Sequence, residues 1–110
     1  MKCIKAPAAE TELTDAAVFY DAQRPGLGDR FIAEFERVAA LLVDNPALGT
    51  CVGGNLRTIC LNRFPFRLIY RLKVSEIRII AIAHQKRRPH YWRTRVEESK
   101  PDYVVLPAAA

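Results

Sequence analysis

The spacing of hydrophobic residues changes halfway along the chain, and this change restricts the fold more than any other feature of the sequence. Before residue 45, apolar side chains recur every three or four positions, which is the period of a helix with one buried face. Beyond residue 56, apolar and polar side chains largely alternate, which is the period of a strand. Helices followed by strands predict an α+β fold, in which a helical layer packs on a sheet.

Two helices are expected in the first half of the chain. Residues 8–23 form the first, which follows Pro7 and has on one face the residues Leu13, Ala16, Ala17 and Tyr20. Residues 29–44 form the second, which ends before Asn45-Pro46 and buries the stripe Phe31, Phe35, Val38 and Leu42. The link at 25–28 contains a proline and two glycines, so the helices should form an antiparallel hairpin.

A small antiparallel sheet of three to four strands is expected to pack against this N-terminal helical hairpin. Its strands are residues 57–61, 66–73 and 77–83, with residues 2–5 as a short first strand. Short turns join the last three strands, which should therefore be antiparallel. Residues 77–83 are almost all apolar, so this strand should be central and covered on both faces.

The length of the chain predicts a single domain. Its 110 residues suffice for one core, which we assign to residues 1–98, and residues 99–110 form a tail that is either a disordered end or an added edge strand. No apolar run reaches the length of about 18 residues that a membrane span needs, and the N-terminus lacks the apolar stretch of a signal peptide. We expect a cytoplasmic protein with no membrane partner.

Positive charge is concentrated in one segment of the chain. The net charge is +5, but residues 57–95 hold eleven basic residues and a single acid, Glu76. Nine of the eleven are arginines, whose planar guanidinium groups suit the recognition of phosphates and carboxylates. The asymmetry favours a polyanionic partner, either a nucleic acid or an acidic protein, over a merely solvated face.

Several kinds of chemistry lack the residues they require. The three cysteines show no CxxC spacing, and His84 and His90 have no companion ligands, so we expect neither a metal nor a cofactor. Gly53-Gly54 is not followed by the Lys and Ser/Thr of a phosphate-binding loop. Most acids fall on the solvent side of the predicted helices, which argues against a catalytic carboxylate pair.

The candidate site is built on the last two predicted strands. If Ser75-Glu76 is a two-residue turn, Arg67 lies opposite His84 and Arg71 opposite Ile80. Arg67 is a charged residue between two apolar ones in mid-strand, so it must face solvent or a partner. This makes Arg67 the first candidate for a functional residue.

The segment after the last strand extends this surface with basic and aromatic side chains. They are Lys86, Arg87, Arg88, His90, Tyr91, Trp92 and Arg93. Arginine binds phosphate and aromatic rings stack on unpaired bases, so this surface suits a nucleic acid. For a metal-independent ribonuclease, His90 and Tyr91 would transfer protons and Arg67 would stabilise the charge. The structural alternative is that Trp92 packs against the helices, that Tyr91 helps to seal the core and that His84 only ends its strand.

Five segments, taken in order, resemble the RelE/ParE toxin family. They are YDAQRPGLGDRF at 20–31, NP at 45–46, RFPFRLIY at 63–70, AHQKRRP at 83–89 and YW at 91–92. The resemblance implies the same helical hairpin on a small sheet, and a role as the toxin of a bacterial type II toxin–antitoxin module. It also implies a cognate antitoxin, usually acidic where it binds, and a toxin–antitoxin heterotetramer as a candidate assembly.

The family contains two activities of different class. RelE-like members cleave mRNA in the ribosome, whereas ParE-like members bind DNA gyrase and block it without being nucleases. Arg67 matches a RelE arginine and Tyr91 matches loosely, but Thr58 and Cys60 stand where that branch carries lysines. Residues 23–28 and 84–92 look more like the ParE-type, plasmid-stabilisation branch. The resemblance favours a ParE-like inhibitor, with a RelE-like endoribonuclease as the alternative and a non-toxic nucleic-acid-binding domain as the least favoured.

Overall fold

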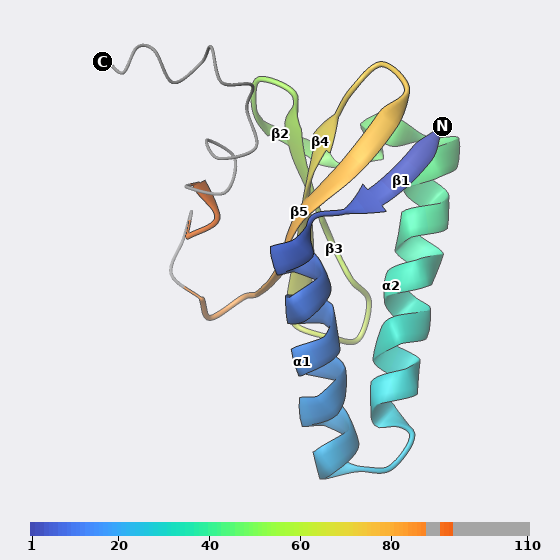
Figure 1. The fold of residues 1–110 in the computed structure, drawn as a ribbon, viewed down its shortest axis with the longest axis vertical. Coiled ribbons are helices and arrows are strands. Elements are labelled where there is room, and N and C mark those ends of the chain that lie inside the picture. Colours follow the sequence, from blue (N-terminus) through green and yellow to red (C-terminus); the bar gives the residue numbers. More distant parts are fainter. Residues whose placement is uncertain (88–90, 94–110) are drawn as a thin grey trace.

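The computed structural model describes residues 1–87 and 91–93, so the tail predicted at 99–110 lies outside the described residues. The elements in chain order (Figure 1) are β1 (Lys2–Lys5), α1 (Pro7–Gln23), α2 (Leu27–Asp44), the 3-10 helix η1 (Pro46–Leu48), β2 (Thr50–Gly53), β3 (Leu56–Cys60), β4 (Phe66–Leu72) and β5 (Glu76–His84). Both helices and four of these strands begin and end within two residues of the predicted bounds. The predicted α+β class is confirmed.

The strands form one five-stranded sheet in the order β1-β5-β4-β3-β2. This is at least one strand more than predicted, and the sheet is mixed rather than antiparallel, because β1 pairs parallel with β5. The sequence pattern misses β2 because all four of its residues are exposed, which leaves no alternation to detect. β1 can run parallel to β5 because no tight turn joins the two strands: the helical hairpin and the strands β2, β3 and β4 lie between them in the chain.

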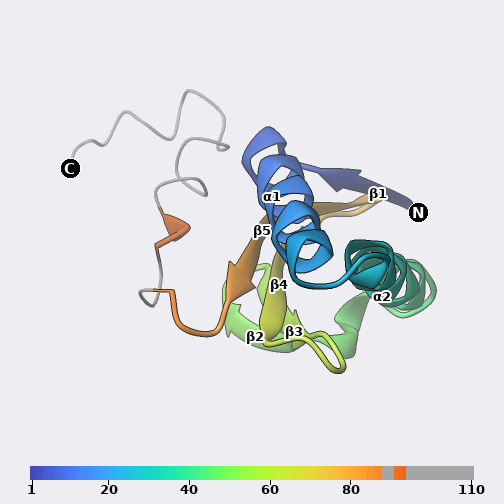
Figure 2. The ribbon, with the colours of Figure 1, turned by 90° about the horizontal axis from the view of Figure 1, so that it is seen from below.

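Both helices cover the same face of the sheet, as Figure 2 shows. The stripe predicted on α2 is buried and forms the main core with α1 and the inner face of the sheet. The helices cross closely at Gly28, whose N–H donates to Asp21 Oδ1 (2.7 Å) and where a Cβ would lie 2.3 Å from the Ala17 carbonyl oxygen. Within the described residues, no helix combines the length and the apolar character that crossing a bilayer demands.

The turn of the β4–β5 hairpin lies one residue earlier than predicted. Lys73 N–H donates to Glu76 O (2.9 Å), so the turn is centred on Val74-Ser75 instead of Ser75-Glu76. The register then shifts again between Ile69 and Tyr70, where the pairing is irregular. Each shift changes the partner of every residue further along the hairpin. Neither shift can be predicted from the alternation of apolar residues in the sequence.

The predicted cross-strand pairs are therefore wrong. Arg67 lies opposite Ala83 and Arg71 opposite Arg78, while His84 pairs with Phe66. Residues at paired positions share a face of the sheet, so His84 lies on the helix-facing side and Arg67 on the other. The arginine and the histidine that the sequence places side by side come from opposite faces of the hairpin.

A second, smaller hydrophobic cluster covers the face of the sheet that the helices leave open. Its buried members are Ile69, Ile80, Ala81, Ala83 and Trp92. Residues 91–93 lie beside this face in Figure 2, across the sheet from the helices. β5 is thus central and buried on both faces, as predicted, but the prediction that Trp92 packs against the helices is wrong.

Candidate functional site

Arg67 projects from the sheet face opposite the helices. Its side chain is exposed, and its neighbours across the sheet are Cys60 on β3 and Ala83 on β5. Thr58 lies two pairs further along β3, opposite Ile69, and its hydroxyl donates to Leu68 O (3.0 Å). The guanidinium group of Arg67 makes no hydrogen bond or ion pair with residues 1–87 or 91–93, so it is available to a ligand.

A pocket of about 220 Å³ brings Arg67 together with several of the other predicted residues. The predicted site residues in its lining are Arg67, His84, Arg87, Tyr91 and Trp92. They come from β4, from the end of β5 and from the segment after it. Lys86 is exposed nearby, whereas Arg88 and His90 lie outside the described residues.

His84 is held at the end of β5 by two contacts. Its ring meets Phe66 edge to face, with the ring centroids 5.0 Å apart. The backbone N–H of Lys86 donates to Nδ1 (3.0 Å). Because Nδ1 accepts this bond, the proton of the neutral ring belongs on Nε2, which is the atom left for a ligand.

Tyr91 is tied to the first helix by Glu12. The Tyr91 hydroxyl donates to Glu12 Oε2 (2.6 Å), and the other carboxylate oxygen accepts from the backbone N–H of Ile82 (2.9 Å). The guanidinium carbon of Arg87 lies 3.9 Å from the centre of the Tyr91 ring, and Arg87 Nη1 lies 4.0 Å from Glu12 Oε2. The position of Glu12 on the predicted helix suggests a solvated surface acid. Its side chain is instead only 14% exposed, and it binds the segment after β5 through Tyr91.

The other candidates divide between buried and exposed positions. Trp92 is 6% exposed, and Arg93 lies with its guanidinium carbon 5.7 Å from the centre of the indole ring. Arg71 is only 7% exposed, between Leu56 and Arg78 on the neighbouring strands, so it does not share the open surface around Arg67. In the part of the chain that the structure describes, no three His, Cys, Asp or Glu side chains gather as metal ligands.

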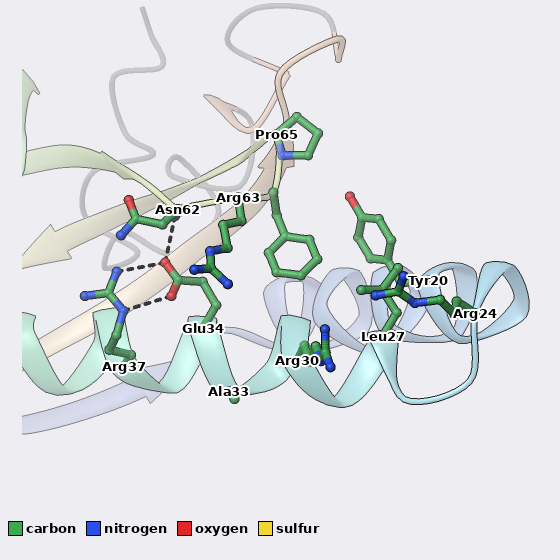
Figure 3. A pocket seen from close by; sticks show the side chains of 11 residues that line it. Tyr20, Arg24, Leu27, Arg30, Ala33, Glu34, Arg37, Asn62, Arg63 and Pro65 are labelled. Atoms are coloured by element: carbon green, nitrogen blue, oxygen red, sulfur yellow. Dashed lines mark hydrogen bonds and ion pairs between the residues drawn. The ribbon is translucent and has the colours of Figure 1, made fainter.

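A larger groove of about 710 Å³ opens on the helix side of the sheet, between the α1–α2 turn, α2 and the β3–β4 loop. Figure 3 shows its lining residues, which include Arg24, Arg30, Arg37 and Arg63. None of these arginines is among the predicted site residues, because α1, α2 and the loop come together here only in the folded chain. The backbone of one of these arginines is unusual: Arg63 adopts a φ of 71°, which non-glycine residues rarely do.

Glu34 occupies one wall of this groove (Figure 3). It accepts two hydrogen bonds from Arg37, each 2.8 Å long, and one from the backbone N–H of Asn62 (2.7 Å). The hydrogen bond from Arg37 lowers the pKa of Glu34, with smaller contributions from the Asn62 N–H and the charge of Arg63. The bond to Asn62 also joins the β3–β4 loop to α2 and so closes this end of the groove.

Comparisons with known proteins identify the family. Residues 4–89 match the family described as the ParE toxin of the type II toxin–antitoxin system, parDE. A solved structure titled "Chromosomal ParDE TA system from P. aeruginosa" has a similar fold, with a TM-score of 0.67, 24% sequence identity and coverage of 76% of this chain and 95% of that one. No curated protein sequence matches. Since the family match spans most of the sequence, the chain belongs to the ParE toxin family of type II toxin–antitoxin systems.

Proposed function

We propose that this chain acts as a growth-inhibiting toxin, that a cognate acidic antitoxin neutralises it, and that it binds DNA gyrase or a similar protein target in the cytoplasm. Its membership of the ParE family supports the toxin role, and its likeness to a ParDE system supports an antitoxin as partner. The basic segment at 57–95 suits an acidic partner. The proposal includes residues 1–98 as the toxin domain and a toxin–antitoxin heterotetramer as the assembly.

The hydrogen bond of Tyr91 is the observation that favours a binding function over RNA cleavage. A general acid must give its proton to the leaving oxygen, but the Tyr91 hydroxyl already donates to Glu12 at 2.6 Å. Thr58 and Cys60 offer no cation beside Arg67 on β3, so the charge of a phosphorane would meet fewer stabilising groups there.

RelE-like cleavage of mRNA is the second candidate, and one observation favours it. Arg67, His84 and Tyr91 line the same pocket, which gathers a cation and two groups capable of proton transfer. If the chain is an endoribonuclease, Arg67, His90 and Tyr91 are the residues that we assign to catalysis. No metal takes part in that mechanism.

Macromolecular synthesis in growing bacteria, measured after induction of this chain alone, tests the proposal. We expect incorporation of thymidine to stop before incorporation of amino acids, and purified chain to inhibit supercoiling by DNA gyrase. Tyr91→Phe removes the proton donor and should leave the growth arrest intact. Arg67→Ala removes the open guanidinium group and should weaken the arrest, while the matched control Lys73→Ala changes an exposed cation in the β4–β5 turn and should not.

Two results would overturn this reading. An early stop in amino-acid incorporation, abolished by Tyr91→Phe and accompanied by cleavage of mRNA on the ribosome, would establish the endoribonuclease instead. Growth that continues normally after induction of the folded, unmodified chain would contradict the toxin role itself.

A further inference from the structure

The groove shown in Figure 3 combines an apolar floor with an arginine rim. Tyr20, Leu27 and Phe64 are partly buried and form the floor. Tyr20 and Phe64 meet edge to face at 5.0 Å, and both also contact Phe31 in the main core. The floor is therefore anchored to the core, and it can receive an apolar side chain without rearrangement.

The rim carries more positive charge than the protein itself neutralises. Arg24, Arg30 and Arg63 are exposed, and none of their guanidinium groups forms a hydrogen bond or ion pair with residues 1–87 or 91–93. Each comes from a different segment: the C-cap of α1, the first turns of α2, and the β3–β4 loop. Guanidinium groups that converge on one groove from three segments attract anionic groups and can bind them in a bidentate manner.

The protein already shows which anionic group fits this groove. The carboxylate of Glu34 is bound there by the fork of Arg37 and by a backbone N–H, with all three hydrogen bonds at 2.8 Å or less. Arg24, Arg30 and Arg63 offer the same fork to carboxylates supplied from outside. A nucleic acid suits the groove less well, because the rings of Tyr20 and Phe64 pack on each other instead of lying open for a base.

We propose that this groove is a docking site for a short acidic peptide segment, in which carboxylates flank one apolar or aromatic anchor. The anchor lies on the floor of Tyr20, Leu27 and Phe64, and the carboxylates bind the arginine rim. This deepens the proposed function, on which it rests, because it locates where the acidic segment of the antitoxin binds. The groove lies on the helix side of the sheet, beside the loop that leads into β4, whereas Arg67 projects from the opposite face, so the antitoxin can hold the toxin without covering that residue directly.

Selection from a phage-displayed library of random short peptides tests the groove and does not require the antitoxin itself. The folded wild-type chain is the bait, and the double variant R24E/R63E serves for counter-selection. Both substituted side chains are exposed, so the variant should fold, which circular dichroism checks. Lys73→Glu is the matched control, because it reverses an exposed charge in the β4–β5 turn, away from the groove.

We expect the selected peptides to carry Asp and Glu around a Leu, Phe or Trp. A synthetic copy should bind R24E/R63E about tenfold or more weakly than the wild type, since two charge-assisted contacts become repulsive, and should bind Lys73→Glu as tightly as the wild type. Peptides without acidic residues, or acidic peptides that bind the double variant equally well, would overturn the proposal. So would a single-stranded oligothymidylate that binds the wild type but not the double variant and displaces the peptides.

The growth measurement after induction separates the two proposals. If the chain is a toxin but the groove does not bind acidic peptides, the unmodified chain arrests growth although no acidic peptide is selected. If the toxin role is wrong, growth continues after induction, whichever peptides the groove selects.

Discussion

Tyr70→Phe removes one oxygen atom from the centre of the protein, and its effect can be worked out from the contacts of that atom. The Tyr70 side chain is 0% exposed. Its hydroxyl donates to Pro46 O (2.8 Å) and accepts from the N–H of Gly49 (2.9 Å). The same hydroxyl therefore joins both ends of η1 to the inner face of β4, and it holds the connection that leads into the edge strand β2.

The substitution leaves two backbone groups without their partner. The Gly49 N–H is buried and should cost about 1 to 3 kcal/mol when it is left unsatisfied, whereas the Pro46 carbonyl is partly buried and should lose about 0.5 to 1.5 kcal/mol. We expect the free energy of unfolding to fall by about 2 to 4 kcal/mol.

Tyr20→Phe is the matched control, since it deletes the same atom from a side chain whose hydroxyl makes no hydrogen bond within the described residues. Its effect should stay within about 0.5 kcal/mol. The assay is urea unfolding followed by circular dichroism and by the fluorescence of Trp92, with the slope m unchanged in both variants. Equal midpoints for Tyr70→Phe, Tyr20→Phe and the parent would refute the reasoning that the buried hydroxyl stabilises this connection.

Three further predictions concern other contacts. Gly28→Ala should lower the melting temperature, because overpacking against the Ala17 carbonyl costs about 1 to 3 kcal/mol, more than the gain of at most about 1 kcal/mol from helix propensity; a rise in a thermal scan would contradict this. The hydrogen bond from Arg37 lowers the pKa of Glu34, so the stabilisation by the Glu34 carboxylate is complete above the pKa of the unfolded state and is lost as the pH falls through the pKa of the folded state. In Glu34→Gln, the free energy of unfolding from urea titrations should therefore fall less steeply with decreasing pH across that window. An unchanged pH dependence would contradict this prediction. Trp92→Ala should cost about 3 to 5 kcal/mol in the same titrations, and a loss below about 1 kcal/mol would show that the second cluster contributes little.

The helical half of the fold could be predicted closely because its information is local. The stripe from Phe31 to Leu42 repeats at helical spacing, and Asn45-Pro46 ends the helix through a restriction on its own backbone. β2 could not be predicted, because an exposed edge strand needs no apolar alternation and is defined only by its hydrogen bonds to β3.

The candidate site was predictable in composition but not in arrangement. Arg67 is exposed, as the alternation with its apolar neighbours Phe66 and Leu68 predicts. The position of His84, in contrast, depends on a turn displaced by one residue and on an irregularity near Tyr70. The contact between Glu12 and Tyr91 joins residues 79 positions apart, and no local pattern encodes such a pair.

The sequence by itself determined the two helices, four of the five strands, the α+β class and the concentration of arginine, because each of these depends on neighbouring residues or on composition. Only the tertiary structure decided which side chains meet. It placed Trp92 across the sheet from the helices, engaged the Tyr91 hydroxyl with Glu12, and brought Arg24, Arg30 and Arg63 to one groove. The physical reason is that register, crossing angle and loop closure are set by the packing of the whole core, and a shift of one residue moves a side chain to the other face.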